Sequence, residues 1–320
     1  MDSANQLGNL WQKSMIGLAR SQWVRDLVQG TGPVRQLAAR FVGGETRKEV
    51  VKTALALKSR GLATSLFFLG EYVTDPARVA HTMAELGQAL KLAGNAGLSL
   101  HTSIDPTQAG LMQSRERCEQ NLGGLAETVR ALARNRASDI LMVDMEDSSV
   151  TQATLEIFSA LQTRGLPVGV TLQACLKRTP GDLPRVSGAM VRLVKGAFAE
   201  SPDIAFRPGK ETDLAYLGLA GKLLDQDSLD RGTVPVFATH DHGLIRQITG
   251  LAARQGIDRD AFEFEMLYGV RPGLQERLAE AGFRVRVYLP FGRDFWPYCV
   301  RRIGENPKNM RFLARALGRG

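Results

Sequence analysis

The sequence lacks the features of a membrane-spanning or secreted protein. No run of about 18 or more apolar residues is present, so we expect no transmembrane helix. The first residues, MDSANQLGNLWQKSM, lack the apolar run and small-residue cleavage site of a signal peptide. Cys118, Cys175 and Cys299 are isolated thiols, which predicts neither a disulfide framework nor a thiolate metal site. These absences favour a cytoplasmic protein in a reducing compartment.

The sequence also has few features of a nucleic-acid-binding protein, although it is basic. Its formal net charge is +8 over 320 residues. The Lys and Arg residues are spread along the chain, and aromatic residues do not alternate with them as they do in a base-stacking platform. We therefore expect no nucleic-acid partner, and the surplus positive charge favours an anionic cofactor or substrate.

Short apolar runs alternate with longer amphipathic segments from about residue 60 onward. The runs are rich in Val, Ile, Leu and Phe, which is typical of strands buried on both faces. They cover residues 63–73, 97–103, 139–146, 167–174, 189–197, 234–241, 262–269 and 284–292. Eight strands alternating with helices predict an α/β protein with a closed (β/α)8 TIM barrel. No G-x-G-x-x-G motif follows the first run, which argues against a Rossmann fold.

Two regions are expected. Residues 1–58 form an N-terminal extension of amphipathic helices, broken at GTGP and VGGE, that packs on the barrel or covers one end. Residues 59–320 form the barrel and a helix after its last strand. That helix is predicted from DFWPYCVRRIGEN, with Asp294 as N-cap and Pro297 in the first turn. Helical spacing then places four side chains on one face, those of Tyr298, Arg301, Arg302 and Glu305.

Nearly every predicted strand ends in polar or aromatic residues. Barrel active sites form at the C-terminal ends of strands, and polar side chains buried there without partners would be costly. The residues concerned are His101, Asp144, Glu146, Asp147, Gln173, Arg192, Lys195, Phe198, Thr239, His240, Asp241, His242, Glu265, Leu267, Tyr268 and Tyr288. We assign Asp147 to helix capping, and the rest predict a binding cavity. The C-terminal helix would fold over this cavity, where Arg301 and Arg302 would hold an anion, most naturally a carboxylate.

The motifs together resemble the proline dehydrogenase family of FAD-dependent barrel enzymes, in its monofunctional type. The matching stretches are LGE, DMED, TLQA, VRLVKGAF, FATHD, FEFEMLYG and YLPFGRDFWPYCVRRIGEN. They run in family order from about residue 60 to 309. The combination of RLVKGA, ATH and Y-x-x-R-R-x-x-E is specific.

The resemblance implies oxidation of L-proline, or a close cyclic secondary amino acid, to a 1-pyrroline-5-carboxylate-type imine by hydride transfer to FAD N5. It implies FAD contacts from Gln173, Arg192, Val194, Lys195, Gly196, Ala197, Thr239, His240, Asp241 and Glu265. It implies catalytic roles for Asp144, Tyr288, Arg301 and Arg302, and substrate contacts from His101, Phe198, Leu267, Tyr298 and Glu305. A membrane quinone would accept the electrons, which adds the expectation of peripheral contact at the inner membrane face.

Four positions depart from the family pattern. His101 stands in place of a usual lysine, Phe198 of a tyrosine, Glu265 of a glutamine and Asp241 of an asparagine. Histidine titrates near neutrality, and the two added acids would disfavour an anionic reduced flavin unless they are paired or protonated. The substrate therefore stays open between L-proline and a hydroxylated, ring-expanded or N-modified relative.

Two other functions are consistent with the strand ends. Asp144, Glu146, His240 and His242 could bind a divalent metal in a barrel hydrolase or aldolase, although the resemblance implies no metal. The chain could also be a catalytically silent barrel that binds an amino acid.

Overall fold

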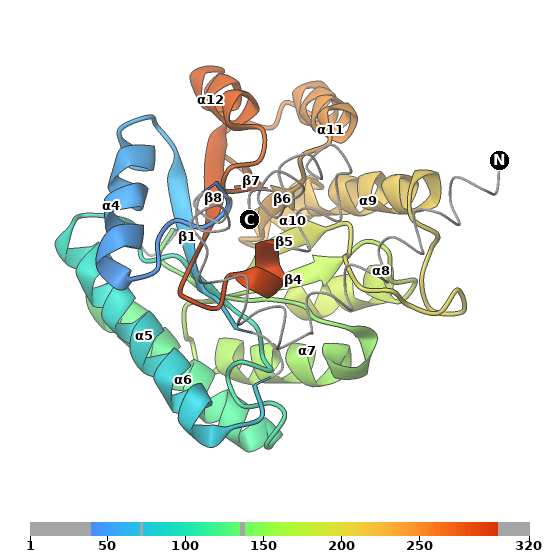
Figure 1. The fold of residues 1–320 in the computed structure, drawn as a ribbon. Helices are drawn as coiled ribbons and strands as arrows, with labels where there is room; N and C mark the ends of the chain where they lie inside the picture. The colour runs from blue at the N-terminus through green and yellow to red at the C-terminus, as the bar shows by residue number, and fades with distance from the viewer. Residues whose placement is uncertain (1–39, 71–72, 135–137, 300–320) are drawn as a thin grey trace, which may run out of the picture.

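The structure is a computed structural model of the chain, and it describes residues 40–70, 73–134 and 138–299. Eight parallel strands form a closed barrel in which each strand pairs with the next and β8 returns to β1. The strands are β1 (Ala63–Phe68), β2 (Thr102–Ile104), β3 (Leu141–Val143), β4 (Val168–Gln173), β5 (Met190–Val194), β6 (Val234–Ala238), β7 (Glu263–Leu267) and β8 (Arg284–Phe291). The predicted (β/α)8 barrel is confirmed (Figure 1).

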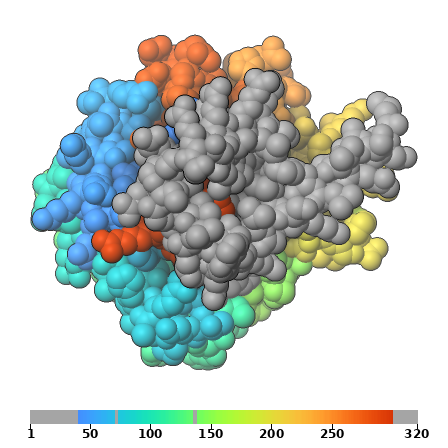
Figure 2. Space-filling view, in the orientation of Figure 1, coloured from blue at the N-terminus to red at the C-terminus, as the bar shows by residue number. Residues whose placement is uncertain are grey.

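Helices surround the barrel in chain order. The long ones are α5 (Pro76–Asn95), α6 (Arg115–Leu132), α7 (Ser148–Thr163), α9 (Lys210–Leu223), α11 (His242–Arg254) and α12 (Pro272–Glu280). Shorter ones are α8 (Thr179–Asp182), the 3-10 helix η1 (Leu183–Val186) and α10 (Gln226–Asp230). Figure 2 shows the same succession as a change of colour around the rim of the molecule. Within the described ranges, no helix is long and apolar enough to cross a membrane.

Three of these helices begin directly after an aspartate in the segment that follows a strand. Asp75, Asp147 and Asp241 each accept a hydrogen bond from the backbone N–H two residues later, at the start of α5, α7 and α11. A carboxylate satisfies a free N–H there and is stabilised by the helix dipole. The assignment of Asp147 to capping is confirmed.

One helix of the predicted N-terminal extension lies within the described residues. The helix α4 (Arg47–Lys58) begins with a capping box between Thr46 and Glu49. It buries Val50 and Ala54 against β1, β8 and α5, so it covers the outer wall where the barrel closes. The rest of the extension, residues 1–39, lies outside the described part, and the division at residue 58 stays a prediction.

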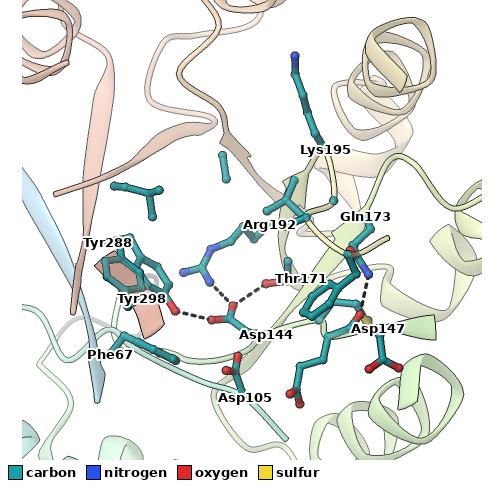
Figure 3. Close-up of a pocket in the computed structure, with 18 of the residues that line it drawn as sticks. Phe67, Asp105, Asp144, Asp147, Thr171, Gln173, Arg192, Lys195, Tyr288 and Tyr298 are labelled. Atoms are coloured by element: carbon teal, nitrogen blue, oxygen red, sulfur yellow. Dashed lines mark hydrogen bonds and ion pairs between the residues drawn. The ribbon is translucent and has the colours of Figure 1, made fainter. Parts of the chain in front are cut away.

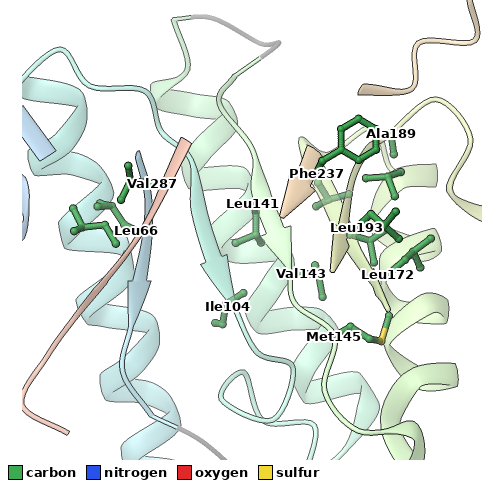
Figure 4. Close-up of a cluster of buried hydrophobic side chains, with 14 of the residues drawn as sticks. Leu66, Ile104, Leu141, Val143, Met145, Leu172, Ala189, Leu193, Phe237 and Val287 are labelled. Atoms are coloured by element: carbon green, nitrogen blue, oxygen red, sulfur yellow. The ribbon is translucent and has the colours of Figure 1, made fainter. Parts of the chain in front are cut away.

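The main hydrophobic core lies between the barrel wall and the helices. Outward-facing strand residues such as Leu66, Ile104, Val143 and Leu172 pack there, and Figure 4 shows part of this cluster. Each is at most 2% exposed. Burial on this scale is the main stabilising term of such a fold.

The inside of the barrel contains two unlike clusters. One is apolar and consists of Met142, Met190 and Val236. Gly169 belongs beside it, because a Cβ there would lie 2.8 Å from both the Met142 methyl carbon and the Met190 carbonyl oxygen. The other cluster is polar and charged, and it leads up to the mouth of the barrel.

Candidate active site

A cavity of about 1180 Å³ opens at the C-terminal ends of the strands. All eight strand ends contribute to its lining, including Phe67 of β1, the residue after β2, Asp144 after β3 and Tyr288 of β8. This is the end of the barrel where enzymes of this fold place their active sites. The volume exceeds that of most small-ligand pockets, so a large cofactor and a small substrate can share it.

Asp144 is held by three donors at the centre of the cavity floor (Figure 3). It accepts hydrogen bonds from the hydroxyls of Thr171 and Tyr288, both at 2.9 Å, and from the Arg192 guanidinium. Burial, followed by the charge of Asp144, raises the pKa of Tyr288 well above its ordinary value. Tyr288 therefore stays protonated and donates to the carboxylate, which fixes the orientation of Asp144.

Arg192 of β5 binds a residue of β7, the next strand but one, inside the barrel. Its Nε and Nη2 donate to the two Glu265 carboxylate oxygens at 2.6 and 2.9 Å, and Nη2 also donates to the Ser103 hydroxyl at 2.8 Å. Its guanidinium carbon lies 5.3 Å from the centre of the Tyr288 ring. Burial lowers the pKa of Arg192, but the charges of Glu265 and Asp144 outweigh burial and raise it. Arg192 is a permanent buried cation.

The chain after β5 carries a second cation. Lys195 lies 2.6 Å from Asp213 and 3.1 Å from Asp241, and hydrogen bonds to these two acids raise its pKa despite burial. The next residue, Gly196, has φ +108°, and a Cβ there would lie 2.2 Å from the Cys175 sulfur. Only glycine lets this segment run so close to β4.

Both acids that depart from the family pattern are paired with cations. Glu265 is bound by Arg192, and burial raises its pKa in spite of that charge. Asp241 caps α11 and is bound by Lys195, which lowers its pKa although burial opposes the shift. Neither therefore acts as an unbalanced negative charge.

All ten residues predicted to contact the cofactor line this one cavity. They are Gln173, Arg192, Val194, Lys195, Gly196, Ala197, Thr239, His240, Asp241 and Glu265. His240 accepts a hydrogen bond at Nε2 from the Leu267 backbone N–H at 2.9 Å. Its ring is therefore unprotonated at Nε2, and Nδ1 is the atom that can donate in the neutral form.

Apart from His101, the predicted catalytic and substrate residues either line the cavity or lie outside the described residues. Asp144, Phe198, Leu267, Tyr288 and Tyr298 line the cavity. The last of these belongs to the helix after β8, which begins at residue 296 and lies over the barrel in Figure 1. Arg301, Arg302 and Glu305 lie outside the described residues, so their placement stays a prediction. Asp294, the predicted N-cap, lies two residues before this helix and forms an ion pair with Arg78 of α5 at 3.1 Å.

His101 does not reach the cavity, which corrects its assignment to the substrate. It is 0% exposed, and its Nδ1 lies 2.9 Å from the Ser65 hydroxyl below the floor. The predicted strand at 97–103 is instead β2, Thr102–Ile104, so residue 101 precedes the strand rather than ending it. Burial and the charges of Arg286 and Arg192 hold the pKa of His101 well below its ordinary value, so its neutral form persists.

The sequence did not predict several residues of the cavity wall. Among them, Phe67 packs on Tyr288 with ring centres 5.2 Å apart, Thr171 donates to Asp144, and Asp105 follows β2. The turn signal Asp-Pro at 105–106 marks the true end of β2 and could have located Asp105.

The four residues considered for a metal do not form a ligand set. Glu146 accepts hydrogen bonds from the Thr107 backbone N–H and hydroxyl at 2.9 and 2.6 Å, whereas His242 is the first residue of α11. Among residues 40–70, 73–134 and 138–299, no three His, Cys, Asp or Glu side chains come together as a metal site.

Known proteins are similar to this chain in sequence and in fold. A family model described as proline dehydrogenase matches residues 50–315. Proline dehydrogenase of Deinococcus radiodurans is 33% identical over 98% of this chain and 100% of its own length. Proline dehydrogenase 1 of Bacillus subtilis (strain 168) is 33% identical over 88% of this chain and 90% of its own. The crystal structure of proline utilization A from Bdellovibrio bacteriovorus superposes with a TM-score of 0.75 at 21% identity, over 89% of this chain and 35% of that one.

Proposed function

Because the chain belongs to the proline dehydrogenase family, we propose that it oxidises L-proline, or a close cyclic secondary amino acid, with FAD as cofactor. The observation that carries the proposal is the cavity at the C-terminal barrel end, with its Asp144–Arg192–Tyr288 cluster. Loss of hydride from the ring carbon and of a proton from the ring nitrogen leaves a 1-pyrroline-5-carboxylate-type imine. FAD, when bound, accepts the hydride.

The residues on one side of the cavity suit FAD. Arg192 and Lys195 supply positive charge, and Gln173, Thr239 and His240 supply hydrogen-bonding groups on neighbouring strand ends. Gly196 brings backbone to the same surface, and cationic side chains with backbone N–H groups are what two phosphates require. We assign the cofactor to these residues.

The other side suits a small cyclic amino acid. Phe67, Tyr288 and Leu267 give flat apolar surface, and Tyr298 would cover the ring from the helix after β8. Arg301 and Arg302 would bind the substrate carboxylate from that helix, with Glu305 orienting them. Positioning in a site closed to water, rather than a nucleophile, is the contribution we assign to the protein.

We extend the proposal to the electron acceptor. A quinone would take the electrons from the reduced cofactor, as the family resemblance implies. The net charge of +8 would favour transient contact with an anionic membrane surface at the inner membrane face.

Anaerobic titration tests this function. The purified protein is loaded with FAD, and visible flavin absorbance is followed as L-proline and related cyclic amino acids are added. Bleaching by at least one of them is the expected result. A protein that binds FAD but is bleached by none would be the catalytically silent barrel instead, and a protein that cannot bind FAD would refute the cofactor assignment.

The arginine pair is tested separately. Arg301→Ala and Arg302→Ala should each raise the apparent substrate constant about tenfold to hundredfold while FAD stays bound, because each loses a charged hydrogen bond. Arg293→Ala is the control, since it removes a nearby arginine whose side chain is 83% exposed. Unchanged apparent substrate constants in both test variants would show that this helix does not bind the substrate carboxylate.

A further inference from the structure

Arg192 reaches the cavity with most of its N–H groups already bound to protein. A guanidinium group donates once through Nε and twice through each Nη. Nε and Nη2 bind Glu265, the second N–H of Nη2 binds Ser103 at 2.8 Å, and Nη1 binds Asp144 (Figure 3). Among the described residues, no further group accepts from Nη1, and Arg192 lines the cavity. The second N–H of Nη1 is therefore the one that Arg192 can offer to a ligand.

Two hydroxyl groups connect Arg192 to a histidine below the cavity floor. Ser103 Oγ lies 2.8 Å from Ser65 Oγ, which lies 2.9 Å from Nδ1 of His101. The side chains of Ser65, Ser103 and His101 are all 0% exposed, and they come from the paired segments β1 and β2. A buried chain of hydrogen bonds thus leads from His101 to a residue of the cavity wall.

The charge of Arg192 sets the direction of this chain. Ser103 accepts from Arg192, so its own O–H donates to Ser65, and the Ser65 O–H donates to Nδ1 of His101. The opposite direction would leave the Ser103 O–H without an acceptor among the described residues and would turn hydroxyl hydrogens toward a cation. Nδ1 of His101 is therefore an acceptor, and the ring carries its proton at Nε2.

The acceptor at Nδ1 is the best physical reason for a histidine at this position. Burial and the charges of Arg286 and Arg192 hold the pKa of His101 well below its ordinary value, so the ring adds no positive charge beside the two arginines. Within the described residues, Nε2 has no hydrogen-bond partner. A buried polar atom without a partner is costly, and an apolar side chain of similar size would avoid that cost.

We propose that His101 is a positioning residue that acts on Arg192 through Ser65 and Ser103. By accepting at Nδ1 it orients both hydroxyl groups, so that Ser103 offers a lone pair to Nη2 and the guanidinium plane is fixed. The remaining N–H of Nη1 is then held in place for an acceptor atom of FAD. The inference rests on the proposed function and deepens it, because it assigns part of the binding geometry to a residue that does not touch the ligand.

The tautomer of His101 is measured first, in the purified full chain labelled with nitrogen-15 histidine. The chain has four histidines, and the His101 signals are those that disappear in His101→Asn. We expect nitrogen chemical shifts of a neutral ring with Nε2 protonated and Nδ1 unprotonated. A proton at Nδ1 would reverse the chain and overturn the inference, whatever the protein oxidises.

Two substitutions of His101 then separate positioning from packing. Asparagine places Oδ1 near the position of Nδ1 and can accept from Ser65, whereas phenylalanine fills the space of the ring without an acceptor. Positioning predicts that asparagine preserves function better, and packing predicts that phenylalanine does. Ser65→Ala breaks the chain with a smaller change of volume. The matched control is Thr102→Val, which removes a buried hydroxyl from β2 that donates to the Leu66 carbonyl oxygen at 2.8 Å.

The readouts are the dissociation constant of FAD and the rate constant of flavin reduction at saturating substrate, both measured anaerobically. In His101→Phe and Ser65→Ala, we expect the first to rise and the second to fall about threefold to tenfold, with KM within about twofold. His101→Asn should stay within about twofold of the wild type in both, although it leaves a cavity and should unfold at a lower urea concentration. The combined variant His101→Phe with Ser65→Ala should lose no more than either substitution alone, since both break one chain.

Three kinetic or binding results would overturn the inference. They are wild-type values in His101→Phe, a smaller loss in His101→Phe than in His101→Asn, or an equal loss in Thr102→Val. The wild-type flavin is still reduced in these cases, so the proposed function survives. If no cyclic amino acid reduces the wild-type flavin, the proposed oxidation fails, and the FAD dissociation constants with the tautomer still decide the role of His101. A chain that binds no FAD refutes both.

Discussion

The two clusters inside the barrel are buried to a similar extent, but one is apolar and the other is charged. Met142, Met190 and Val236 are at most 3% exposed and pack together as an apolar cluster. Arg192 and Glu265 are 2% exposed and form charged hydrogen bonds with each other inside the barrel. A buried ion pair seldom stabilises a fold more than apolar residues of the same volume would. The charged cluster is therefore best explained by the cavity above it, and the apolar cluster by stability alone.

Arg192→Met tests this difference with the largest expected effect. It leaves Glu265 and Asp144 buried without their cation, which should cost about 3–5 kcal/mol of unfolding free energy. Urea unfolding of the FAD-free protein measures this loss, and the flavin content of the purified variant should fall as well. A stability loss below that of the apolar variant described next would contradict the comparison.

Met190→Ala opens a cavity in the apolar cluster. We expect a loss of about 2–3 kcal/mol, at the low end for such truncations because the flexible Met142 beside it can fill part of the space. Bound FAD per folded protein should stay at the wild-type value, since Met190 does not line the site. Altered flavin stoichiometry would show that the two clusters are coupled.

The contributions of the two β7 glutamates, Glu263 and Glu265, to folding stability should change with pH in opposite directions. Arg286 and Arg284 lower the pKa of Glu263 below 4.5 although burial opposes them, so its stabilisation is present above 4.5 and is lost as pH falls through the lowered value. Burial raises the pKa of Glu265 above 4.5, so its contribution is present below 4.5 and is lost as pH rises through the raised value.

Glu263→Gln and Glu265→Gln make this contrast measurable. Unfolding free energies are compared with the wild type at pH steps on both sides of 4.5. The stability difference between wild type and variant should grow with rising pH for Glu263 and shrink for Glu265, with a slope of at most about 1.4 kcal/mol per pH unit. Parallel slopes for the two variants would show that the carboxyls titrate together.

Asp241→Asn should have the smallest effect. Asparagine still caps α11, and the lost ion pair with Lys195 is partly exposed, so stability should change by less than about 1 kcal/mol. Thermal unfolding measures this change. A much larger loss would mean that Asp241 belongs with the charged interior rather than with the rim.

The sequence predicted those cavity residues that lie in or directly after a clear apolar run. Asp144, Arg192, Glu265 and Tyr288 follow from the position of each apolar run, because parallel strands bring their C-terminal ends together. It failed at β2, where the short strand Thr102–Ile104 left the strand end ambiguous by several residues. When the end of β2 is placed a few residues too early, the buried His101 is expected at the mouth of the barrel in place of Asp105. The apolar pattern alone does not fix the end of so short a strand.

By itself the sequence determined the alternation of strands and helices, and thus the closed barrel, because the period of apolar residues is a local property. It also determined which residue types stand near the strand ends. Only the tertiary structure decided which charges meet, since Arg192 and Glu265 lie 73 positions apart and pair only when the sheet places the inner faces of β5 and β7 on either side of β6. The same closure separates His101 from the cavity and brings Asp105 into it, because depth along the barrel axis depends on how neighbouring strands are staggered.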